Sequence, residues 1–305
     1  MLFRWMKRVF QSQPQNKGEE QQRQTKQPVK LGPSLQNKFE LIKKAFESSP
    51  DFVARDFPNP VPSHTSLAVC YLEGLTDPSL VGELMEKVIQ IVNTSPQCEE
   101  EVPDLSLELS LPSGNIERIE SLEEVYQAVL TGHLIILVEG IEHVIAVSVS
   151  GGERRSVEEP TSQTVVRGPK EGFTEELATN ITLIRRKIRS PDLKFFKHNI
   201  GEYTQTSVAV AYIQGIAKPE VVDEVNKRLR SIHTDSILES GYIEEFIQDA
   251  PLTPFPTMLN TERPDTVAGS LLDGQVAILI DGTPFALVAP VTFFNFFQTT
   301  EDYYQ

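Results

Sequence analysis

The sequence predicts an α/β protein made of two similar tandem α/β subdomains, each a small mixed β-sheet with a C-terminal hairpin packed by helices. Three observations lead to this fold class. The chain has 305 residues, which at about 150 residues per domain suggests two domains. An internal repeat relates its two halves. Within each copy an apolar run of strand length is followed by a turn and then by apolar residues at helical spacing.

The repeat aligns without a gap and identifies a duplicated unit. Residues 65–88 read TSLAVCYLEGLTDPSLVGELMEKV, and residues 206–229 read TSVAVAYIQGIAKPEVVDEVNKRL. Nine of these 24 positions are identical at an offset of 141. The same offset pairs SPD at 49–51 with SPD at 190–192. With one added residue, HLIILVEG from 133 aligns with QVAILIDG from 275.

A strand and a helix come first in each copy. In the first copy, the apolar run 67–72 predicts a short buried strand that Gly74 closes. Pro78 then stands where the first turn of a helix tolerates proline, and apolar residues recur at helical spacing from Val81 to Val92.

A second helix and a hairpin complete each copy. Apolar spacing over residues 125–130 predicts the helix, which ends before Gly132. Two apolar runs then flank Glu139-Gly140, a two-residue signal for a tight hairpin, and Asp281-Gly282 gives the same signal in the second copy.

The domain organisation follows from the repeat and from composition. The sequence predicts a basic, flexible tail, a first subdomain, a Gly-, Ser- and charge-rich connector and a second subdomain, at residues 1–33, 34–150, 151–172 and 173–298.

A helix is predicted to open the second subdomain. Thr174 is its expected N-cap, and apolar residues from Leu177 to Ile188 form one stripe. On the opposite face, Arg185, Arg186 and Lys187 are predicted to lie in solvent.

Charge is unevenly distributed along the chain. Residues 1–33 hold seven Lys or Arg and two Glu, a net charge of +5, which leaves −20 on the rest. At the start, MLFRWMKRVF predicts a basic amphipathic helix with Arg4, Lys7 and Arg8 opposite its apolar side. Such a segment could lie in a membrane interface with Trp5 at headgroup level, or bind a partner, or fray as a free terminus.

Composition argues against several classes of protein. The net charge of −15 argues against nucleic-acid binding. Two cysteines, Cys70 and Cys98, are expected to be free thiols, and no run is long enough to span a membrane. No metal-ligand pair, catalytic triad or phosphate-binding glycine loop is recognisable, so no enzyme, metal or cofactor is predicted.

Longer motifs resemble a known family. These are VVRGPKEGFTEELATNITLIRRKIRSPDLKF (165–195), YIEEFIQD (242–249), TPFP (253–256), NTERPD (260–265) and VAILIDGTPFALVAPVTFFNFFQTTEDYYQ (276–305). Together they resemble the N-terminal soluble region of the A subunit of GerA-type spore germinant receptors. Lys170 stands where that pattern has Arg, which keeps the charge and gives up the planar fork.

The resemblance implies a setting for the whole protein. It implies a subunit of the spore inner membrane that acts with B and C subunits in nutrient-triggered germination, with other A subunits as further partners. Residues 299–305 would lead into membrane helices outside this sequence. The basic N-terminus and the free thiols favour the cytoplasmic, spore core side of the membrane for this region.

Two functions remain open at this stage. The first is subunit assembly and signal relay, with Phe293, Phe294, Phe296 and Phe297 as contacts to the membrane part or a neighbouring subunit. The second is binding of a small nutrient in a cleft between the subdomains. Its candidate residues precede or open a helix whose free N–H groups favour anions: Arg167, Lys170, Glu171 and Thr174. Structural turns and a charge near the helix start are the alternative explanation for this segment.

Overall fold

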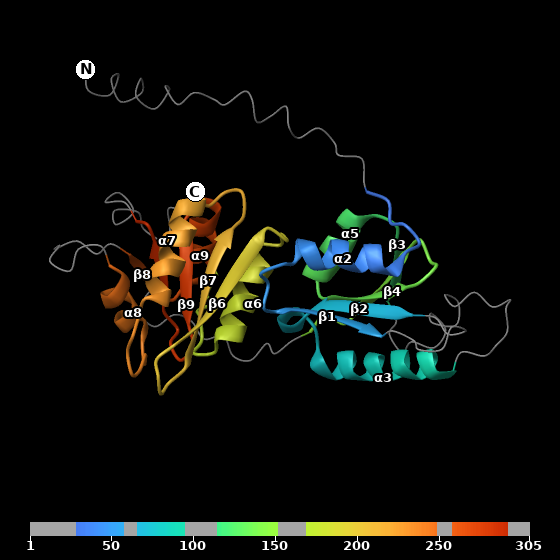
Figure 1. The fold of residues 1–305 in the computed structure, drawn as a ribbon, viewed down its shortest axis with the longest axis horizontal. Helices are drawn as coiled ribbons and strands as arrows, with labels where there is room; N and C mark the ends of the chain where they lie inside the picture. Colours follow the sequence, from blue (N-terminus) through green and yellow to red (C-terminus); the bar gives the residue numbers. More distant parts are fainter. Residues whose placement is uncertain (1–28, 58–65, 95–114, 152–168, 249–257, 292–305) are drawn as a thin grey trace, which may run out of the picture.

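The structure, a computed structural model, describes residues 29–57, 66–94, 115–151, 169–248 and 258–291, with the side chains of 91–94 excepted. Figure 1 shows two α/β units side by side, unit 1 (residues 29–151) and unit 2 (residues 169–291). Unit 1 contains α2 (Leu35–Ala45), β1 (Phe52–Phe57), β2 (Leu67–Leu72), the 3-10 turn η1 (Glu73–Leu75), α3 (Pro78–Thr94), β3 (Ile116–Ile119), α5 (Leu122–Leu130), β4 (His133–Val138) and β5 (Val144–Ser148). Unit 2 contains α6 (Leu177–Lys187), β6 (Leu193–Ile200), β7 (Thr206–Ile213), α7 (Pro219–Arg230), α8 (Ser240–Ile247), β8 (Leu259–Thr261), α9 (Pro264–Leu272), β9 (Val276–Ile280) and β10 (Ala286–Ala289).

The two units have the same sheet topology. The strand order is β1-β2-β4-β5-β3 in unit 1 and β6-β7-β9-β10-β8 in unit 2. Strand for strand the orders correspond, which confirms the predicted pair of similar α/β subdomains. Every strand pair within these sheets is antiparallel, so the mixed sheet that the sequence predicts is wrong. The helix α5 does connect two strands that run in the same direction, but β5 lies between them and separates them.

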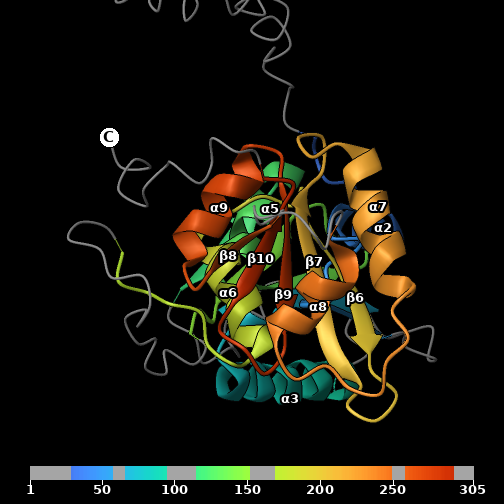
Figure 2. The same cartoon turned by 90° about the vertical axis from the view of Figure 1, so that its left-hand side faces the viewer.

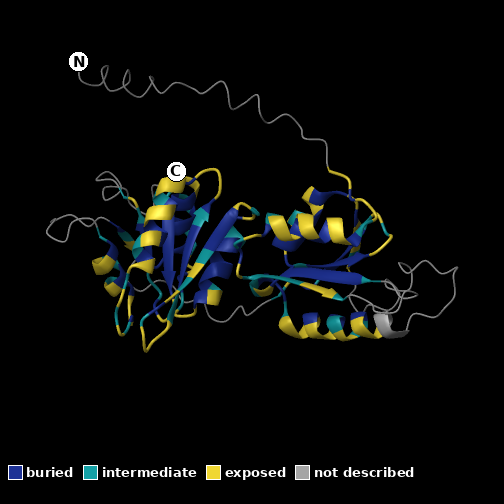
Figure 3. Cartoon of the chain, in the orientation of Figure 1, coloured by how far each residue is buried: buried dark blue, intermediate teal, exposed yellow. Residues whose placement is uncertain are grey.

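Both faces of each sheet are covered by helices. In unit 1, α2 and α5 pack on one face and α3 on the other. In unit 2, α6 and α9 cover one face, and α7 and α8 the other (Figure 2). Because water reaches neither face of a central strand, all residues of β2 and β9 are buried (Figure 3). These strands therefore read as continuous apolar runs in the sequence.

Residues 29–33 contact unit 1, although the sequence analysis groups them with the tail. Lys30 pairs with Ser121 in an isolated antiparallel bridge. Leu31 is buried in the core beneath α2 and α5. Two isolated apolar residues, Val29 and Leu31, give too weak a signal to predict this contact.

The hairpin turn caps the first helix in both units. Glu139 Oε2 accepts a hydrogen bond from the backbone N–H of Leu35 at 2.8 Å. At the equivalent place in unit 2, Asp281 Oδ1 accepts from the N–H of Leu177 at 3.0 Å. These acidic residues precede the predicted turn glycines, which have φ values of +83° and +87°. A carboxylate at a helix N-terminus accepts a hydrogen bond from a free N–H and interacts favourably with the positive end of the helix dipole.

The predicted capping role of Thr174 is wrong. The helix α6 begins three residues later, at Leu177, with Glu176 at the N-cap position. Thr174 instead donates its backbone N–H to Asn180 Oδ1 at 2.8 Å. The distant Asp281 supplies the capping acceptor, which no local sequence pattern reveals.

Removing these two caps tests the equivalence of the units. We expect Asp281→Ala to reduce the free energy of unfolding by about 1 kcal/mol. Glu139→Ala should cost more. Burial lowers the pKa of Lys38, and the negative charge of Glu139 counteracts this effect, so the substitution also destabilises the charged form of Lys38. Denaturant unfolding would measure both. The control is Asp273→Ala, which removes an exposed acid just after the C-terminus of α9. A loss of stability at only one of the two caps would contradict the equivalence.

Cys70 is a buried thiol in β2. Burial raises the pKa of this thiol to about 12, so roughly one molecule in ten thousand carries the reactive thiolate at pH 8. We expect iodoacetamide to leave Cys70 unmodified in the native protein and to alkylate it in denaturant, as read by peptide mass spectrometry. Alkylation of native Cys70 at the rate of a free cysteine would contradict its burial. Cys98 lies outside the described residues.

Candidate functional site

Two segments of unit 1 meet two elements of unit 2. The segments are the turn after α2 and the 3-10 turn η1, and they lie against α6 and β6. Ser48 has a φ of +61°, and its carbonyl oxygen accepts from the N–H of Phe195 at 2.9 Å. The Lys194 Nζ donates to the carbonyl oxygen of Ala45 at 2.6 Å. Backbone carbonyl groups of unit 1 thus accept hydrogen bonds from two consecutive residues of β6.

A buried ion pair crosses the junction. Arg185 Nε and Nη2 donate to the two carboxylate oxygens of Asp51 at 2.8 and 2.9 Å. Its Nη1 donates to the carbonyl oxygen of Leu193 at 2.9 Å, and the guanidinium lies 4.9 Å from the ring centre of Phe195. The Arg185 side chain is fully buried, which corrects its predicted place on a solvated helix face. A two-pronged contact of this kind fixes orientation as well as distance.

The close approach of η1 to α6 depends on a glycine. A Cβ at position 74 would overlap Thr182 Oγ1 and come within 3.1 Å of Thr182 Cβ. Thr182 is itself held by a hydrogen bond from its hydroxyl to the carbonyl oxygen of Ala178 at 2.9 Å. Gly74, which is predicted to close a strand, therefore also permits contact between the units.

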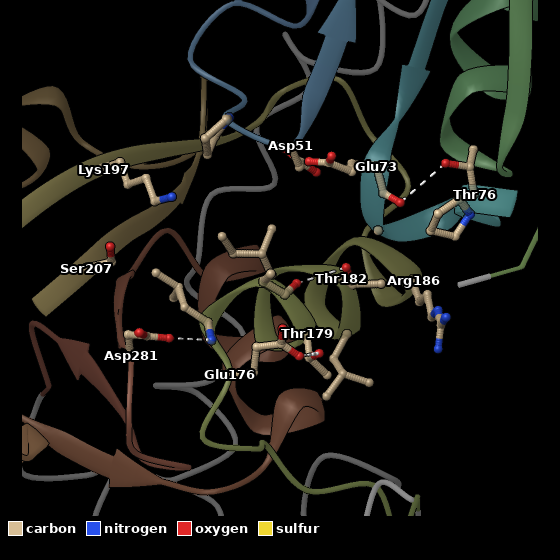
Figure 4. Close-up of a pocket in the computed structure, with 17 residues that line it drawn as sticks. Asp51, Glu73, Thr76, Glu176, Thr179, Thr182, Arg186, Lys197, Ser207 and Asp281 are labelled. Carbon is tan, nitrogen blue, oxygen red and sulfur yellow. Dashed lines mark hydrogen bonds between the residues drawn. The ribbon is translucent and has the colours of Figure 1, made fainter. Parts of the chain in front are cut away.

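A pocket of about 550 Å³ opens beside this contact, between the two units. Figure 4 shows its polar side chains, which come from the turn before β1 and from η1 and the residue after it in unit 1, and from α6, β6, β7 and the hairpin turn in unit 2. Glu176 accepts from the Thr179 hydroxyl at 2.6 Å, and Asp281 caps α6. The cations Lys197 and Arg186 also line the pocket and have no ion-pair partner in the described part of the chain.

None of the predicted ligand residues that the structure describes lines this pocket. Glu171 is exposed and forms an ion pair with Lys187 at 3.2 Å, and Lys170 is exposed beside it. Thr174 packs on Asn180. Their role in ligand binding stays a prediction. Other predicted contacts lie outside the described residues: Arg4, Trp5, Lys7, Arg8, Arg167, Phe293, Phe294, Phe296 and Phe297.

A second buried arginine explains part of the NTERPD motif. Arg263 is fully buried at the start of α9, where it pairs with Asp265 and donates from Nη2 to the carbonyl oxygen of Pro169 at 3.2 Å. The neighbouring Glu262 carbonyl accepts from the N–H of Phe173 at 2.8 Å. The segment from Pro169 to Phe173 is thereby anchored to unit 2, and the motif has a structural role.

The described residues show neither a metal centre nor a membrane span. No group of three His, Cys, Asp or Glu side chains in these ranges is placed to hold a metal ion. None of the helices that the structure describes is long and apolar enough to cross a bilayer.

The fold identifies the class of protein. A solved structure with a TM-score of 0.67 and 37% sequence identity covers 87% of this chain and 98% of its own. It is the N-terminal domain of the A subunit of the Bacillus megaterium spore germinant receptor GerK3. This chain therefore has the fold of a germinant receptor A-subunit N-terminal domain.

The chain belongs to the Bacillus/Clostridium GerA spore germination protein family, which it matches over residues 40–305. It is 43% identical over 284 residues to spore germination protein KA of Bacillus subtilis (strain 168). The aligned region covers 93% of this chain and 52% of that protein. It is 39% identical to spore germination protein GerLA of Bacillus cereus over 243 residues, 80% of this chain and 49% of that protein. The chain thus spans about half the length of these relatives. Another relative, at 37% identity, is an uncharacterized membrane protein of Bacillus subtilis (strain 168), YfkQ.

Proposed function

We propose that this chain is the N-terminal region of a germinant receptor A subunit and acts, without catalysis, by assembling with other subunits and relaying a signal. The observation that supports relay is the buried contact between Asp51 and Arg185. A contact that fixes both orientation and distance couples the two units, so a displacement of one moves the other. B and C subunits of the same receptor are the proposed partners, with other A subunits as further ones.

The proposed setting is the spore inner membrane, with this region on the spore core side. The thiol of Cys70, which forms no disulfide in the described part of the chain, supports this side, since thiols stay unpaired in reducing compartments. The attachment would run through membrane helices beyond residue 305.

Germination of spores that carry junction variants tests the proposal. We expect Asp51→Asn in the whole receptor to delay the nutrient response at least about tenfold. A loss of about 1.4 kcal/mol in the coupling free energy between the two units changes the equilibrium between resting and activated receptor tenfold. Asp192→Asn, the repeat-related acid on the surface of unit 2, should germinate normally. Subunit levels and copurification of the B and C subunits would be measured in parallel. A normal response from Asp51→Asn would contradict a relay through this contact.

The junction pocket favours a second candidate function, binding of a small nutrient. Its volume of about 550 Å³ suits a small molecule. Lys197 and Arg186 would be available to such a ligand. Isothermal titration with germinants should then give a saturable heat that Lys197→Ala abolishes and Lys218→Ala, an exposed lysine at the start of α7, preserves. An absence of heat for every germinant would leave assembly and relay as the function.

A further inference from the structure

Helix α8 presents an apolar stripe to solvent. Tyr242 and Phe246 are four residues apart within the helix, so they lie along one side, and Leu238 is exposed two residues before the helix begins. Their exposed fractions are 65%, 42% and 50%. The opposite side of α8 is buried against the core of unit 2 through Ile243 and Ile247. The exposed side chains therefore do not contribute to the core of unit 2.

The charged residues next to the stripe in the sequence are all acidic, and one cation from another helix, Arg228 of α7, donates to the carbonyl oxygen of Ile247 at 2.6 Å. Residues 234–248 contain Asp235, Glu239, Glu244 and Glu245 and no Lys or Arg. None of these four acids forms an ion pair within the described part of the chain. The pKa of Glu244 is raised by desolvation and then by repulsion from Glu245. A cationic, apolar partner would cover the stripe and relieve this repulsion.

We propose that the basic apolar segment MLFRWMKRVF, residues 1–10 of a second copy of this chain, binds the stripe formed by Leu238, Tyr242 and Phe246. The segment carries three positive charges and no acid, and its apolar residues include Trp5. It therefore matches the stripe in both charge and hydrophobicity.

The position of α8 favours a second copy as the donor of the segment. Residue 29 belongs to unit 1, whereas α8 lies at the end of unit 2 that faces away from unit 1 (Figures 1 and 2). Residues 11–28 connect the segment to unit 1, and a flexible chain of that length has an r.m.s. span of only about 23 Å. A head-to-tail contact between copies needs no such crossing of the whole molecule.

Trp5 is the single tryptophan of the sequence and reports the contact directly. We expect the emission of the full chain to move to shorter wavelength as protein concentration rises, because Trp5 leaves water. Phe246→Ser should weaken this concentration-dependent shift at least about tenfold, as loss of a central aromatic contact does. Glu245→Lys should weaken it as well. Leu272→Ser, an apolar residue of α9 with 57% exposure, is the matched control and should change nothing.

Three results would overturn the proposal. One is a Trp5 emission that stays at the wavelength of the free side chain at every concentration. Another is a shift that Phe246→Ser and Glu245→Lys leave intact, or that does not depend on concentration. The third is a shift that occurs only when vesicles of anionic phospholipid are added, since the membrane would then be the partner. Melting curves of each variant confirm that the fold is retained, as expected for exposed side chains.

Discussion

Asp51→Asn should destabilise the isolated region by about 3 kcal/mol, because it leaves the fully buried Arg185 guanidinium without its counter-charge. In a chain of this size such a loss lowers the melting temperature by roughly 6 °C or more. Thermal and denaturant unfolding, each followed by circular dichroism, would measure the effect. The loss should be specific to the pair, since Asp51 is only 14% exposed and both of its carboxylate oxygens are used.

The internal repeat provides the control for this variant. Asp192 is the counterpart of Asp51 at the repeat offset and is exposed. In the described part of the chain, its carboxylate accepts a side-chain hydrogen bond only from the Ser190 hydroxyl, at 3.3 Å. Asp192→Asn should therefore cost less than about 1 kcal/mol. Replacing the pair by apolar residues, Asp51→Leu with Arg185→Met, should recover much of the stability, because no buried charge remains. Equal losses for the two Asp→Asn variants would contradict the assignment.

Gly74→Ala should destabilise the junction by about 1–3 kcal/mol, because a methyl group at this position overlaps the Thr182 hydroxyl. The residue has no positive φ, so the loss reports the contact and not backbone strain. Thr182→Ala removes the overlapping oxygen and should restore part of the stability in the double variant. Additive losses in this cycle would contradict direct contact between the two positions.

Gly82 is the matched control and should give an effect of the opposite sign. It lies in the exposed face of α3, and a Cβ there would meet nothing within 4 Å. Gly82→Ala should therefore stabilise the protein by up to about 1 kcal/mol through helix propensity alone. Both substitutions add one methyl group, so the opposite signs show that Gly74→Ala destabilises through the contact with Thr182 and not through the added methyl group as such.

The duplicated fold could be predicted because its signals are local. Central strands buried on both faces must be continuously apolar, and the tight hairpins need a residue that tolerates positive φ, as Gly140 and Gly282 do. The edge strands β1 and β6 carry mixed polar and apolar residues, since one edge and part of a face contact solvent or the other unit. They gave no comparable pattern. The mixed sheet was a wrong prediction because sequence order does not reveal which strand lies between two others.

The junction could not be predicted because its partners are distant in the sequence. Arg185 and Asp51 are 134 residues apart, and the run of three cations around Arg185 is typical of a solvated helix face. The repeated SPD motif was visible, but only the structure shows that its first copy contacts unit 2 and its second does not. The segment with Lys170 and Glu171 has the charges and glycines typical of an anion site, whereas the pocket beside α6 is formed by segments distant in the sequence.

The central claim is that the two units move as one body, and a distance across the junction tests it most directly. Spin labels would be placed at Glu83 on α3 and Asp223 on α7, both exposed, with Cys98→Ser to avoid a second reactive thiol. We expect pulsed electron resonance to give one narrow distance distribution that nutrients leave unchanged and that Asp51→Asn broadens. A shift of the whole distribution to a different distance on adding a germinant would contradict the account and indicate closure of the units around a ligand.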